Sequence, residues 1–463
     1  MFRLFRVFIP TSVLVLLVSE VLLVTGSYLL ASRIVLEEEL TPFLYSENGW
    51  FRMGLVVASV ILGLHLTDLY RRIRVIGRLV LLQDLCQVLG IALLAQGLIS
   101  YAFPPLRLGR GSMLVGSSFA LVLLFAWRLF YSAYIVRVVG LRKILFVGYN
   151  QLVQEIADHI IEQPDRGFEI AGYLADEQAQ GKELTGGTVL GAVGQVRRIA
   201  EEVRPGLIVV GLTERRARMP LQDLLELRFA GFAIQESGTA YEAVLGRIST
   251  KELRPSQLIF TEELGPRRGA LALQSLMNFS ISLVGAISLL PVMLLVAILV
   301  KLTSRGPVLY RQTRVGRNGR LFVVYKFRSM RSDAESLTGA VWAQPNDPRI
   351  TPLGRWLRRL RLDELPQFFN VLRGEMSLVG PRPERPEFVN SLAERIPYYR
   401  QRHCVRPGIT GWAQINHKYG DSVEDVITKL EYDLYYIKHV SPSLDAYILF
   451  QTIKTILLTR GAQ

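Results

Sequence analysis

Two adjacent carboxylates, Asp363 and Glu364, follow a run of arginines in the stretch RRLRLDELPQFFN, residues 358–370. One interpretation is structural, because aspartate caps helices well, acidic residues favour the first helical turn, and Pro366 is tolerated there. The other is chemical: nearby arginines would hold the pKa of a carboxylate low, and an ionised carboxylate can act as a covalent nucleophile. The two interpretations are compatible, so the surrounding residues must separate them.

Groups suited to binding phosphate occur on both sides of this pair. Upstream, an alternating, β-like run in VVYKFRSM delivers Lys326 and Arg328, and Arg358 follows closer to the carboxylates. Downstream, GPRP holds Arg382 between Pro383 and a second proline, which reduces the backbone entropy lost in fixing it. Arginine presents a planar fork of donors that matches phosphate oxygens, and lysine adds a point charge. These residue types indicate a site that handles phosphate groups.

Metal ligands are sparse in the same region. No ring of carboxylates demands a tightly held metal. One glutamate together with substrate phosphates would suit Mg²⁺, which keeps several waters and needs few protein ligands. Gly408, Gly411 and Gly420, in the block RPGITGWAQINHKYGDS, would let loops approach a ligand closely.

The whole chain is basic and apolar. Its 463 residues suffice for two or three domains, and half of them are hydrophobic, which points to a membrane. The net charge of +14 fits nucleic acid, an anionic membrane surface or phosphorylated substrates. The two cysteines, Cys86 and Cys404, give no disulfide framework, and the five scattered histidines include no HExxH. We therefore expect neither a disulfide scaffold nor a zinc site.

Four apolar segments near the N-terminus are long enough to cross a bilayer. They lie at residues 7–31, 51–70, 77–101 and 113–137. The first resembles a signal peptide but is too long and lacks a clear cleavage site, so we interpret it as a retained helix. Basic residues before the first segment, between the second and third, and after the fourth place both ends of this unit, residues 1–140, in the cytoplasm. Four charged residues lie in or beside the spans, where we expect contacts between helices or interfacial positions: Glu20, Asp68, Asp84 and Arg128.

A Rossmann-like domain is predicted over residues 141–260. The stretch RKILFVGYNQLVQEIADHIIEQ has the β-run, glycine turn and amphipathic helix of such an opening, with further strands expected at 168–174, 206–212 and 232–235. After Gly148, however, Tyr149 and Asn150 replace the glycines that let backbone approach a pyrophosphate. A regulatory or assembly domain is therefore favoured over a dinucleotide-binding one.

The same domain order raises a rival enzyme, a membrane-bound NAD-dependent nucleotide-sugar dehydratase or epimerase. Such catalysis generally needs a Tyr-x-x-x-Lys pair, in which the lysine lowers the pKa of the tyrosine. None of the eighteen tyrosines has a lysine four positions on. This hypothesis is therefore disfavoured.

A fifth apolar segment, residues 276–302, is long enough to span, yet positive charge flanks it on both sides. Residues 301–361 alone hold fourteen Lys and Arg. Because both flanks then favour the cytoplasm, and Pro291 can break the helix near its middle, a re-entrant helix that turns near this proline meets both constraints. A plain span is commoner, since prolines are tolerated in transmembrane helices, and the motifs further along the chain decide for the re-entrant helix.

The ordered blocks KFRSM, LDELPQ, SLVGPRP and RPGITGWAQIN resemble the catalytic domain of bacterial polyprenyl-phosphate sugar-1-phosphate transferases. These are the monotopic phosphoglycosyl transferases, including undecaprenyl-phosphate glucose and galactose phosphotransferases, that initiate exopolysaccharide, capsule and O-antigen synthesis. The resemblance covers residues 270–463 densely. It implies a membrane protein with a four-helix bundle, a Rossmann-like α/β domain and a C-terminal α/β catalytic domain carrying the re-entrant helix.

The resemblance also implies a two-step displacement. Asp363 would attack the β-phosphate of a UDP-sugar and release UMP, and undecaprenyl phosphate would then attack the aspartyl-phosphosugar intermediate. Glu364 would help hold Mg²⁺. The expected substrate- and phosphate-binding residues are Lys326, Arg328, Arg358, Arg382 and Pro383. The protein would lie in the bacterial inner membrane with its catalytic domain on the cytoplasmic face.

The expected partners are a UDP-sugar, undecaprenyl phosphate and the lipid bilayer, without nucleic acid. A homo-oligomer and contacts with other polysaccharide-assembly proteins are compatible with the sequence. A non-catalytic scaffold for polysaccharide assembly, in which Asp363 and Glu364 only cap a helix, stays open as an alternative. The identity of the sugar and the role of the Rossmann-like domain also stay open.

Overall fold

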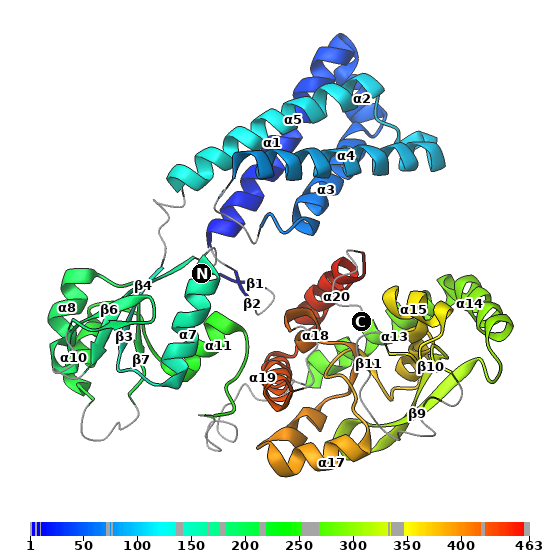
Figure 1. Ribbon diagram of the computed structural model, residues 1–463. Helices are drawn as coiled ribbons and strands as arrows, with labels where there is room; N and C mark the ends of the chain where they lie inside the picture. The colour runs from blue at the N-terminus through cyan, green and yellow to red at the C-terminus, as the bar shows by residue number, and fades with distance from the viewer. Residues whose placement is uncertain are drawn as a thin grey trace. The chain divides into compact units, whose positions relative to one another are not determined.

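The structure is a computed structural model of the chain (Figure 1). It describes residues 2–4, 7–9, 11–70, 75, 77–135, 142–164, 167–175, 181–212, 219–251, 268–331, 334, 347–417 and 422–457. The chain divides into two compact units, one built mainly from residues 8–237 and the other mainly from residues 238–463. Each unit is described by itself below.

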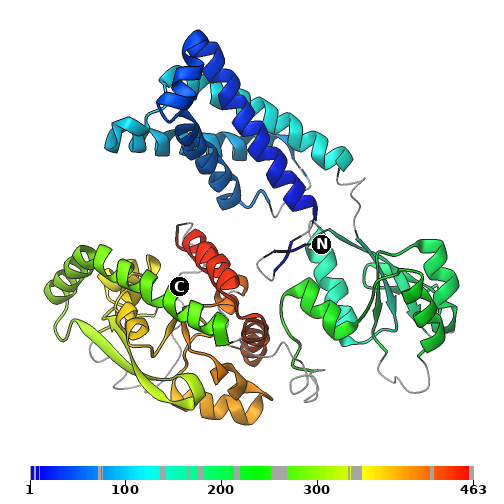
Figure 2. The same ribbon diagram turned by 180° about the vertical axis from the view of Figure 1, so that it is seen from behind.

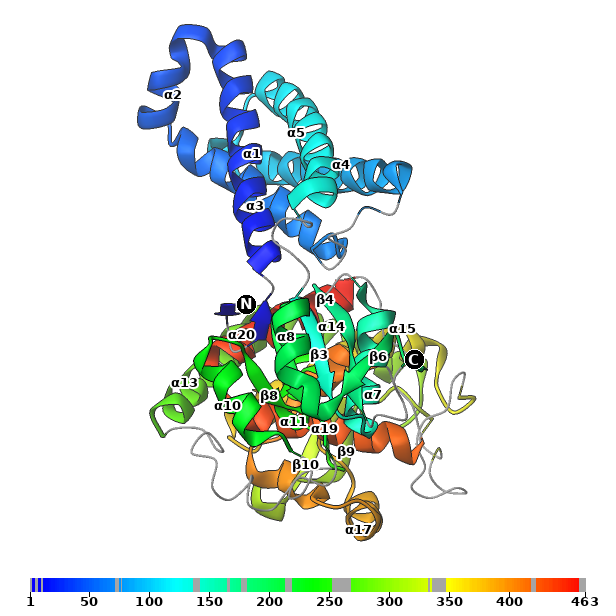
Figure 3. The ribbon, with the colours of Figure 1, turned by 90° about the vertical axis from the view of Figure 1, so that its left-hand side faces the viewer.

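Long apolar helices form the first part of the N-terminal unit. They are α1 (Thr11–Leu36), α3 (Gly49–Leu66), α4 (Arg78–Ala102) and α5 (Arg110–Phe130), with a short α2 (Leu40–Ser46) between the first two. Each long helix has the length and composition of a membrane span. Figure 3 shows α1 and α5 running side by side. The first helix begins at Thr11 rather than at residue 7, because residues 7–9 form a short strand, β2, paired with β1 (Phe2–Leu4).

Glu20 and Arg128 join two of these helices, as expected. Both side chains are almost fully buried, and Arg128 Nε lies 2.7 Å from Glu20 Oε1. Arg128 Nη1 also donates to the carbonyl oxygen of Leu69. A paired and hydrogen-bonded charge is tolerated inside an apolar bundle where a lone charge is costly, so this pair fixes how α1 and α5 meet.

The second part of the N-terminal unit is a six-stranded sheet in the order β5-β6-β4-β3-β7-β8. Its strands are β3 (Arg142–Val147), β4 (Phe168–Ala175), β5 (Glu183–Leu184), β6 (Gly187–Ala192), β7 (Leu207–Val210) and β8 (Ile234–Glu236). All neighbours are parallel except β5 and β6. Helices α8 (Val196–Val203) and α10 (Leu221–Phe229) pack on one face, and α7 (Gln151–Glu162) lies on the other (Figure 1). The sheet confirms a Rossmann-like α/β arrangement, although β5 and β6 were not predicted.

Side chains pack closely around the glycine turn that follows β3. Gly148 has a φ of +88°, and a Cβ there would lie 2.7 Å from a Leu212 side-chain carbon. Asn150 Oδ1 accepts a hydrogen bond from the backbone N–H of Val153, so this side chain occupies the N-terminus of α7. The geometry agrees with the sequence, in which the phosphate-binding glycines are replaced.

The C-terminal unit combines helices with two small sheets. Strands β9 (Leu309–Val315) and β10 (Leu321–Phe327) form an antiparallel hairpin, and β11 (Ser377–Val379) pairs in parallel with β12 (Gly408–Thr410). The helices are α13 (Arg268–Ser288), α14 (Leu290–Thr303), α15 (Pro352–Arg359), α16 (Gln367–Leu372), α17 (Pro386–Arg395), α18 (Trp412–Asn416), α19 (Val423–His439) and α20 (Pro442–Leu457). Residues of α19 and α20 form much of its core with β11.

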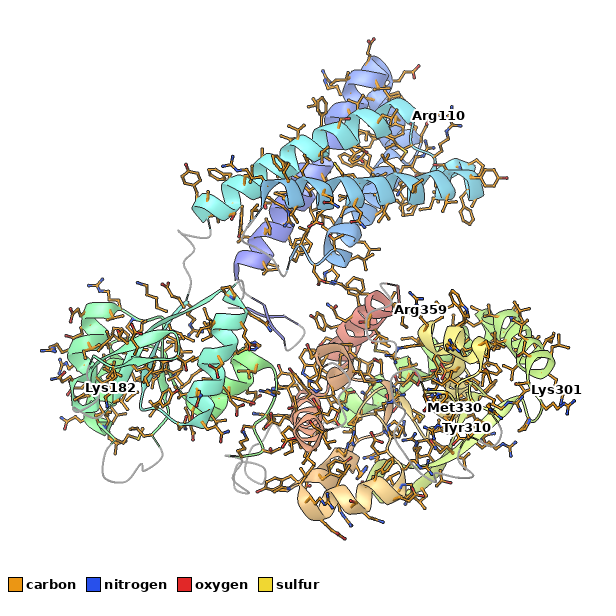
Figure 4. The ribbon with its side chains drawn as sticks, viewed as in Figure 1. Arg110, Lys182, Lys301, Tyr310, Met330 and Arg359 are labelled. Carbon is orange, nitrogen blue, oxygen red and sulfur yellow. The ribbon has the colours of Figure 1, made fainter. Side chains whose placement is uncertain are left out.

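The fifth apolar segment is two helices rather than one. α13 ends at Ser288, and Leu289 separates it from α14, whose first turn contains Pro291. The proline therefore starts the second helix instead of interrupting the first, as a residue without a backbone N–H can do at no cost. In Figure 2, α13 is the green helix that runs across the near side of this unit, and Lys301 projects outward near the end of α14 in Figure 4. Whether the pair re-enters the membrane stays a prediction.

Residues 238–251 belong to the C-terminal unit, although the sequence analysis placed them in the Rossmann-like domain. Tyr241, in α11 (Ser237–Leu245), donates from its hydroxyl to Glu431 Oε2 at 3.0 Å. The backbone N–H of Thr250 donates to Glu431 Oε1 at the same distance. Because a buried carboxylate needs donors, these contacts tie the segment to α19.

Candidate active site

Asp363 and Glu364 lie in a short 3₁₀ turn, Leu362–Glu364, between α15 and α16. Arg361, just before the turn, has a φ of +53°, a left-handed conformation that reverses the chain. Both carboxylate residues are about 7% exposed. No side-chain hydrogen bond caps the start of the turn or the start of α16. Helix capping therefore does not explain why two carboxylates occupy this position.

Glu364 is held by three cationic side chains from separate segments. Its Oε1 accepts hydrogen bonds from Lys326 Nζ at 2.9 Å and from Arg382 Nη2 at 2.8 Å. Its Oε2 lies 3.7 Å from Arg361 Nη1. Burial opposes ionisation of this carboxyl, but Arg382, Lys326 and Arg361 outweigh it and hold its pKa far below the usual range. Glu364 is therefore ionised across the physiological range.

Asp363 behaves differently, and the expectation of a low pKa was wrong. Burial is the largest influence on its carboxyl, and the adjacent charge of Glu364 adds to it. The positive charges of Lys326, Arg358 and Arg382 offset these effects only in part, so the pKa of Asp363 is raised to about 6. At neutral pH the carboxylate is still mostly ionised, and desolvation leaves it poorly stabilised by water, as suits a nucleophile.

Three of the predicted basic residues surround the pair. Lys326 extends from β10 and Arg382 from the loop after β11, and both bind Glu364. Arg358 lies in the last turn of α15, where its Nε donates to Ser329 Oγ at 3.0 Å, and its charge acts on Asp363. The hairpin, α15 and the loop after β11 thus bring together side chains that lie more than fifty residues apart in sequence.

Arg328 does not join them. Its Nη2 donates to the carbonyl oxygen and to the Oγ of Ser304, just after α14, at 2.8 and 2.7 Å. The side chain is almost fully buried there, 6% exposed. Because Arg328 follows Phe327, which packs against Val296 and Val300 of α14, its guanidinium holds the end of that apolar helix. Its Nε and Nη1 are buried without a hydrogen-bond partner in the described structure, so a phosphate contact of Arg328 stays a prediction.

Pro383 contributes through its backbone. Its carbonyl oxygen accepts a hydrogen bond from Arg314 Nη1 at 3.0 Å. This hydrogen bond helps to fix the loop that carries Arg382. The Pro383 ring carries no polar group that could bind the carboxylate pair.

Gly408 and Gly411 serve close backbone packing. A Cβ at Gly408 would lie 2.1 Å from the backbone nitrogen of Gly380, and one at Gly411 would lie 2.3 Å from its carbonyl oxygen. Only glycine permits β12 to approach the end of β11 so closely. Gly420 lies outside the described residues. The glycines thus set the position of the loop containing Arg382.

Two residues near the site were missed as functional in the sequence. Arg361 had been noted only as a neighbour, yet it pairs with Glu364. Asn370, fully buried in α16, donates to the carbonyl oxygen of Val323 at 2.7 Å and accepts from the N–H of Tyr325 at 3.2 Å. An asparagine inside an otherwise apolar helix, FFNVL, was the available signal for such a link between α16 and β10.

The donor set fits Mg²⁺ that arrives with phosphates, but not a metal held by protein alone. Glu364 Oε2 is buried without a hydrogen-bond partner, so it can accept a cation ligand bond. Within the described residues, no group of three or more His, Cys, Asp or Glu gathers around a common point. One or two carboxylates plus substrate phosphates are the usual protein environment of Mg²⁺.

Comparisons with known proteins identify the family of the chain. A family model described as bacterial sugar transferase matches residues 270–459, and one described as a CoA-binding domain matches residues 65–219. A UDP-N-acetylgalactosamine-undecaprenyl-phosphate N-acetylgalactosaminephosphotransferase from Aeromonas hydrophila is 53% identical over 173 residues, which are 37% of this chain and 41% of the relative. An undecaprenyl-phosphate glucose phosphotransferase from Komagataeibacter xylinus is 51% identical over 181 residues, 38% of this chain and 34% of the relative.

A longer match extends beyond the catalytic domain. A UDP-glucose:undecaprenyl-phosphate glucose-1-phosphate transferase from Klebsiella pneumoniae is 33% identical over 332 residues, 69% of each chain. These relatives are named as undecaprenyl-phosphate sugar phosphotransferases, which places the chain among the phosphoglycosyl transferases. The chain belongs to the bacterial sugar transferase family. It covers less than half the length of the Aeromonas and Komagataeibacter relatives.

Proposed function

We propose that the protein transfers a sugar-1-phosphate from a UDP-sugar to undecaprenyl phosphate and so initiates a bacterial surface polysaccharide. The observation that carries the proposal is the buried pair of Asp363 and Glu364, in which one carboxylate is fixed by cations and the other is not. This asymmetry supports two roles, one electrostatic and one nucleophilic. The family to which the chain belongs acts on the same substrate class, as the names of its relatives indicate.

The first step forms a bond between a carboxylate oxygen of Asp363 and the phosphorus that carries the sugar. The bond from this phosphorus to the bridging oxygen breaks, and UMP leaves with that oxygen. Lys326, Arg358 and Arg382 are positioned to stabilise the negative charge that develops on the phosphoryl oxygens.

In the second step an oxygen of undecaprenyl phosphate attacks the same phosphorus and displaces the Asp363 carboxylate. The product is undecaprenyl-diphospho-sugar, and the free carboxylate is restored. Because the acceptor is already an anionic nucleophile, neither step requires a general base.

Mg²⁺ would supply charge neutralisation across the diphosphate. Glu364 would hold it through the oxygen that has no hydrogen-bond partner. Lys326 and Arg382 keep the other oxygen of Glu364 in place, so the carboxylate is oriented before any cation binds.

We expect α13 and α14 to enter the inner membrane and to leave it on the same side. This arrangement would place the chemistry at the cytoplasmic face. α14 has 14 residues, about 21 Å of helix, which is shorter than the hydrocarbon core of a bilayer. Apolar side chains on the outward faces of both helices are exposed, among them Leu276, Val284 and Leu294. On α13, Asn278 instead donates to Ser377 Oγ, and Gln274 to Asp445 Oδ2. One face thus suits lipid and the other is bonded to the catalytic domain.

The proposal is tested by UMP release from detergent-purified protein across a panel of UDP-sugars. Each donor is assayed with and without undecaprenyl phosphate, and with Mg²⁺ or with EDTA. We expect lipid- and Mg²⁺-dependent release with one donor, which would also identify the sugar. Absence of release with every UDP-sugar, in protein that remains folded, would overturn the proposal and favour a scaffold.

The rate of the first half-reaction should fall as the pH drops through about 6, because protonation of Asp363 removes the nucleophile. The measurement is the burst of UMP released without undecaprenyl phosphate, whose own phosphate titrates in the same range and would obscure the result. Circular dichroism at each pH controls for unfolding. A burst rate that is constant from pH 5 to 7 would contradict the role of Asp363.

A further inference from the structure

The loop that carries Arg382 is held by the carbonyl oxygens of three consecutive residues. The Pro381 oxygen accepts from the N–H of Gly408 at 2.9 Å. The Arg382 oxygen accepts from Arg402 Nη2 at 3.0 Å, and the Pro383 oxygen from Arg314 Nη1 at 3.0 Å. The two prolines have no N–H to donate, so the loop backbone is held in place by hydrogen bonds to these carbonyl oxygens.

Arg402 is the more deeply buried of the two arginine donors. It lies in the 3₁₀ segment Tyr399–Cys404, is 8% exposed, and its Nη1 donates to Tyr399 Oη at 2.7 Å. Its Nη2 also lies 2.8 Å from Asp433 Oδ2 in α19, a carboxylate that is 2% exposed. The pairing with Asp433 neutralises the guanidinium charge, and Tyr399 holds its orientation, so Nη2 reaches the Arg382 carbonyl from a fixed point.

We infer that Arg402 is a positioning residue for the transfer reaction: it fixes the backbone of Arg382 so that the Arg382 guanidinium meets Glu364 beside the nucleophile. The inference rests on the proposed function. Arg402 makes no contact with either carboxylate of the pair among its described hydrogen bonds and ion pairs. Its effect on the reaction therefore passes through Arg382, whose Nη2 lies 2.8 Å from Glu364 Oε1.

Arg314 is a weaker candidate for the same role. Its Nη1 is shared between the Pro383 carbonyl and the side chain of Glu384, and about a fifth of its side chain is exposed. Its Nε donates to Gln312 Oε1 in β9 at 2.9 Å, so its anchors are a partly exposed strand residue and the loop that it would fix. Arg402 is anchored instead by residues of the C-terminal core, Tyr399 and Asp433.

The substitution Arg402→Lys separates the effect of positioning from the effect of charge. Arg402→Lys keeps a cation that can pair with Asp433, but a single ammonium cannot reproduce the forked contacts with Tyr399, Asp433 and the Arg382 carbonyl. Arg400→Lys, two residues away at an exposed position of the same segment, is the matched control. Tyr399→Phe is a milder variant that removes only the hydroxyl acceptor.

The experiment is a double-mutant cycle on UMP release by the full-length protein. Arg402→Lys and Tyr399→Phe are each made in the native background and in Arg382→Lys. We expect Arg402→Lys to lower kcat by about 10- to 100-fold with little change in KM, since small displacements of a catalytic group have effects of this size. In the Arg382→Lys background the same change should lower kcat by less than about threefold, because the effects of substitutions at coupled residues are not additive. Tyr399→Phe should show the same pattern with a smaller loss, and Arg400→Lys should match the native protein.

Thermal melts of every variant measure how far each substitution destabilises the fold. The comparison of kcat in the two backgrounds then separates positioning from a purely structural role. Loss of core packing would lower kcat by the same factor in both backgrounds, and that result would overturn the inference. If Arg402→Lys does not fold, Tyr399→Phe carries the same comparison, and equal losses in both backgrounds would again overturn it. Absence of UMP release from the native protein would instead overturn the proposed function, so the two failures are distinguishable.

Discussion

Asp363→Asn is expected to abolish UMP release, with a loss of at least about 1,000-fold in the first half-reaction, because an amide cannot form the acyl phosphate. The side chain changes little in volume, so the fold should persist. The measurement is the burst of UMP from a suitable UDP-sugar, together with mass spectrometry of the peptide containing residue 363. In the native protein, without undecaprenyl phosphate, that peptide should gain the mass of a sugar phosphate.

A matched control is Asp347→Asn. Asp347 is also buried, 6% exposed against 7% for Asp363, and its carboxylate is bound by Arg349 rather than by the residues that hold Glu364. It should retain most of the activity. An adduct on another residue, or a normal burst in Asp363→Asn, would assign the nucleophile elsewhere and return the pair to a supporting role.

Cysteines at the two ends of the α13–α14 pair should be labelled from the same side of the membrane. The proposal places Gly269 and Lys301, both exposed, on the cytoplasmic face. Gly269→Cys and Lys301→Cys, each in a chain with Cys86 and Cys404 replaced, should resist a membrane-impermeant maleimide in intact spheroplasts. Both should react fully once the membrane is opened.

A plain span would give the opposite pattern, with one position reactive in intact spheroplasts and the other protected. A cysteine in a known periplasmic protein controls for reagent activity. UMP release by each variant checks that the substitution has not displaced the helices. Protection of only one position would therefore establish a crossing helix and overturn the re-entrant arrangement.

The sequence predicted the parts of the site that depend on local pattern. The basic residues Lys326 and Arg382, chosen from their motifs, both pair with Glu364 in the structure. Arg328 shows the limit of this reasoning. It is two residues from Lys326 on the same run, yet its side chain reaches Ser304, since a strand that ends between the two no longer fixes side-chain direction.

Burial was the other quantity that the sequence could not supply. The arginines near Asp363 predicted a low pKa, but the pKa is raised because the carboxyl is desolvated and adjoins Glu364. The contacts of Arg402 with Tyr399, Arg382 and Asp433 depend on tertiary packing, to which the linear pattern gives no guide.

The cationic cluster around Glu364 has a consequence for discrimination among ligands. Its arginines stay charged at any physiological pH, so they attract every polyanion that reaches the site, including nucleotides that are not donors. The positive charge therefore speeds the association of anionic ligands but gives no specificity among them. Selection of a nucleoside and of a sugar must come from neutral contacts outside the cluster, and product UMP should compete with the donor for the same cations.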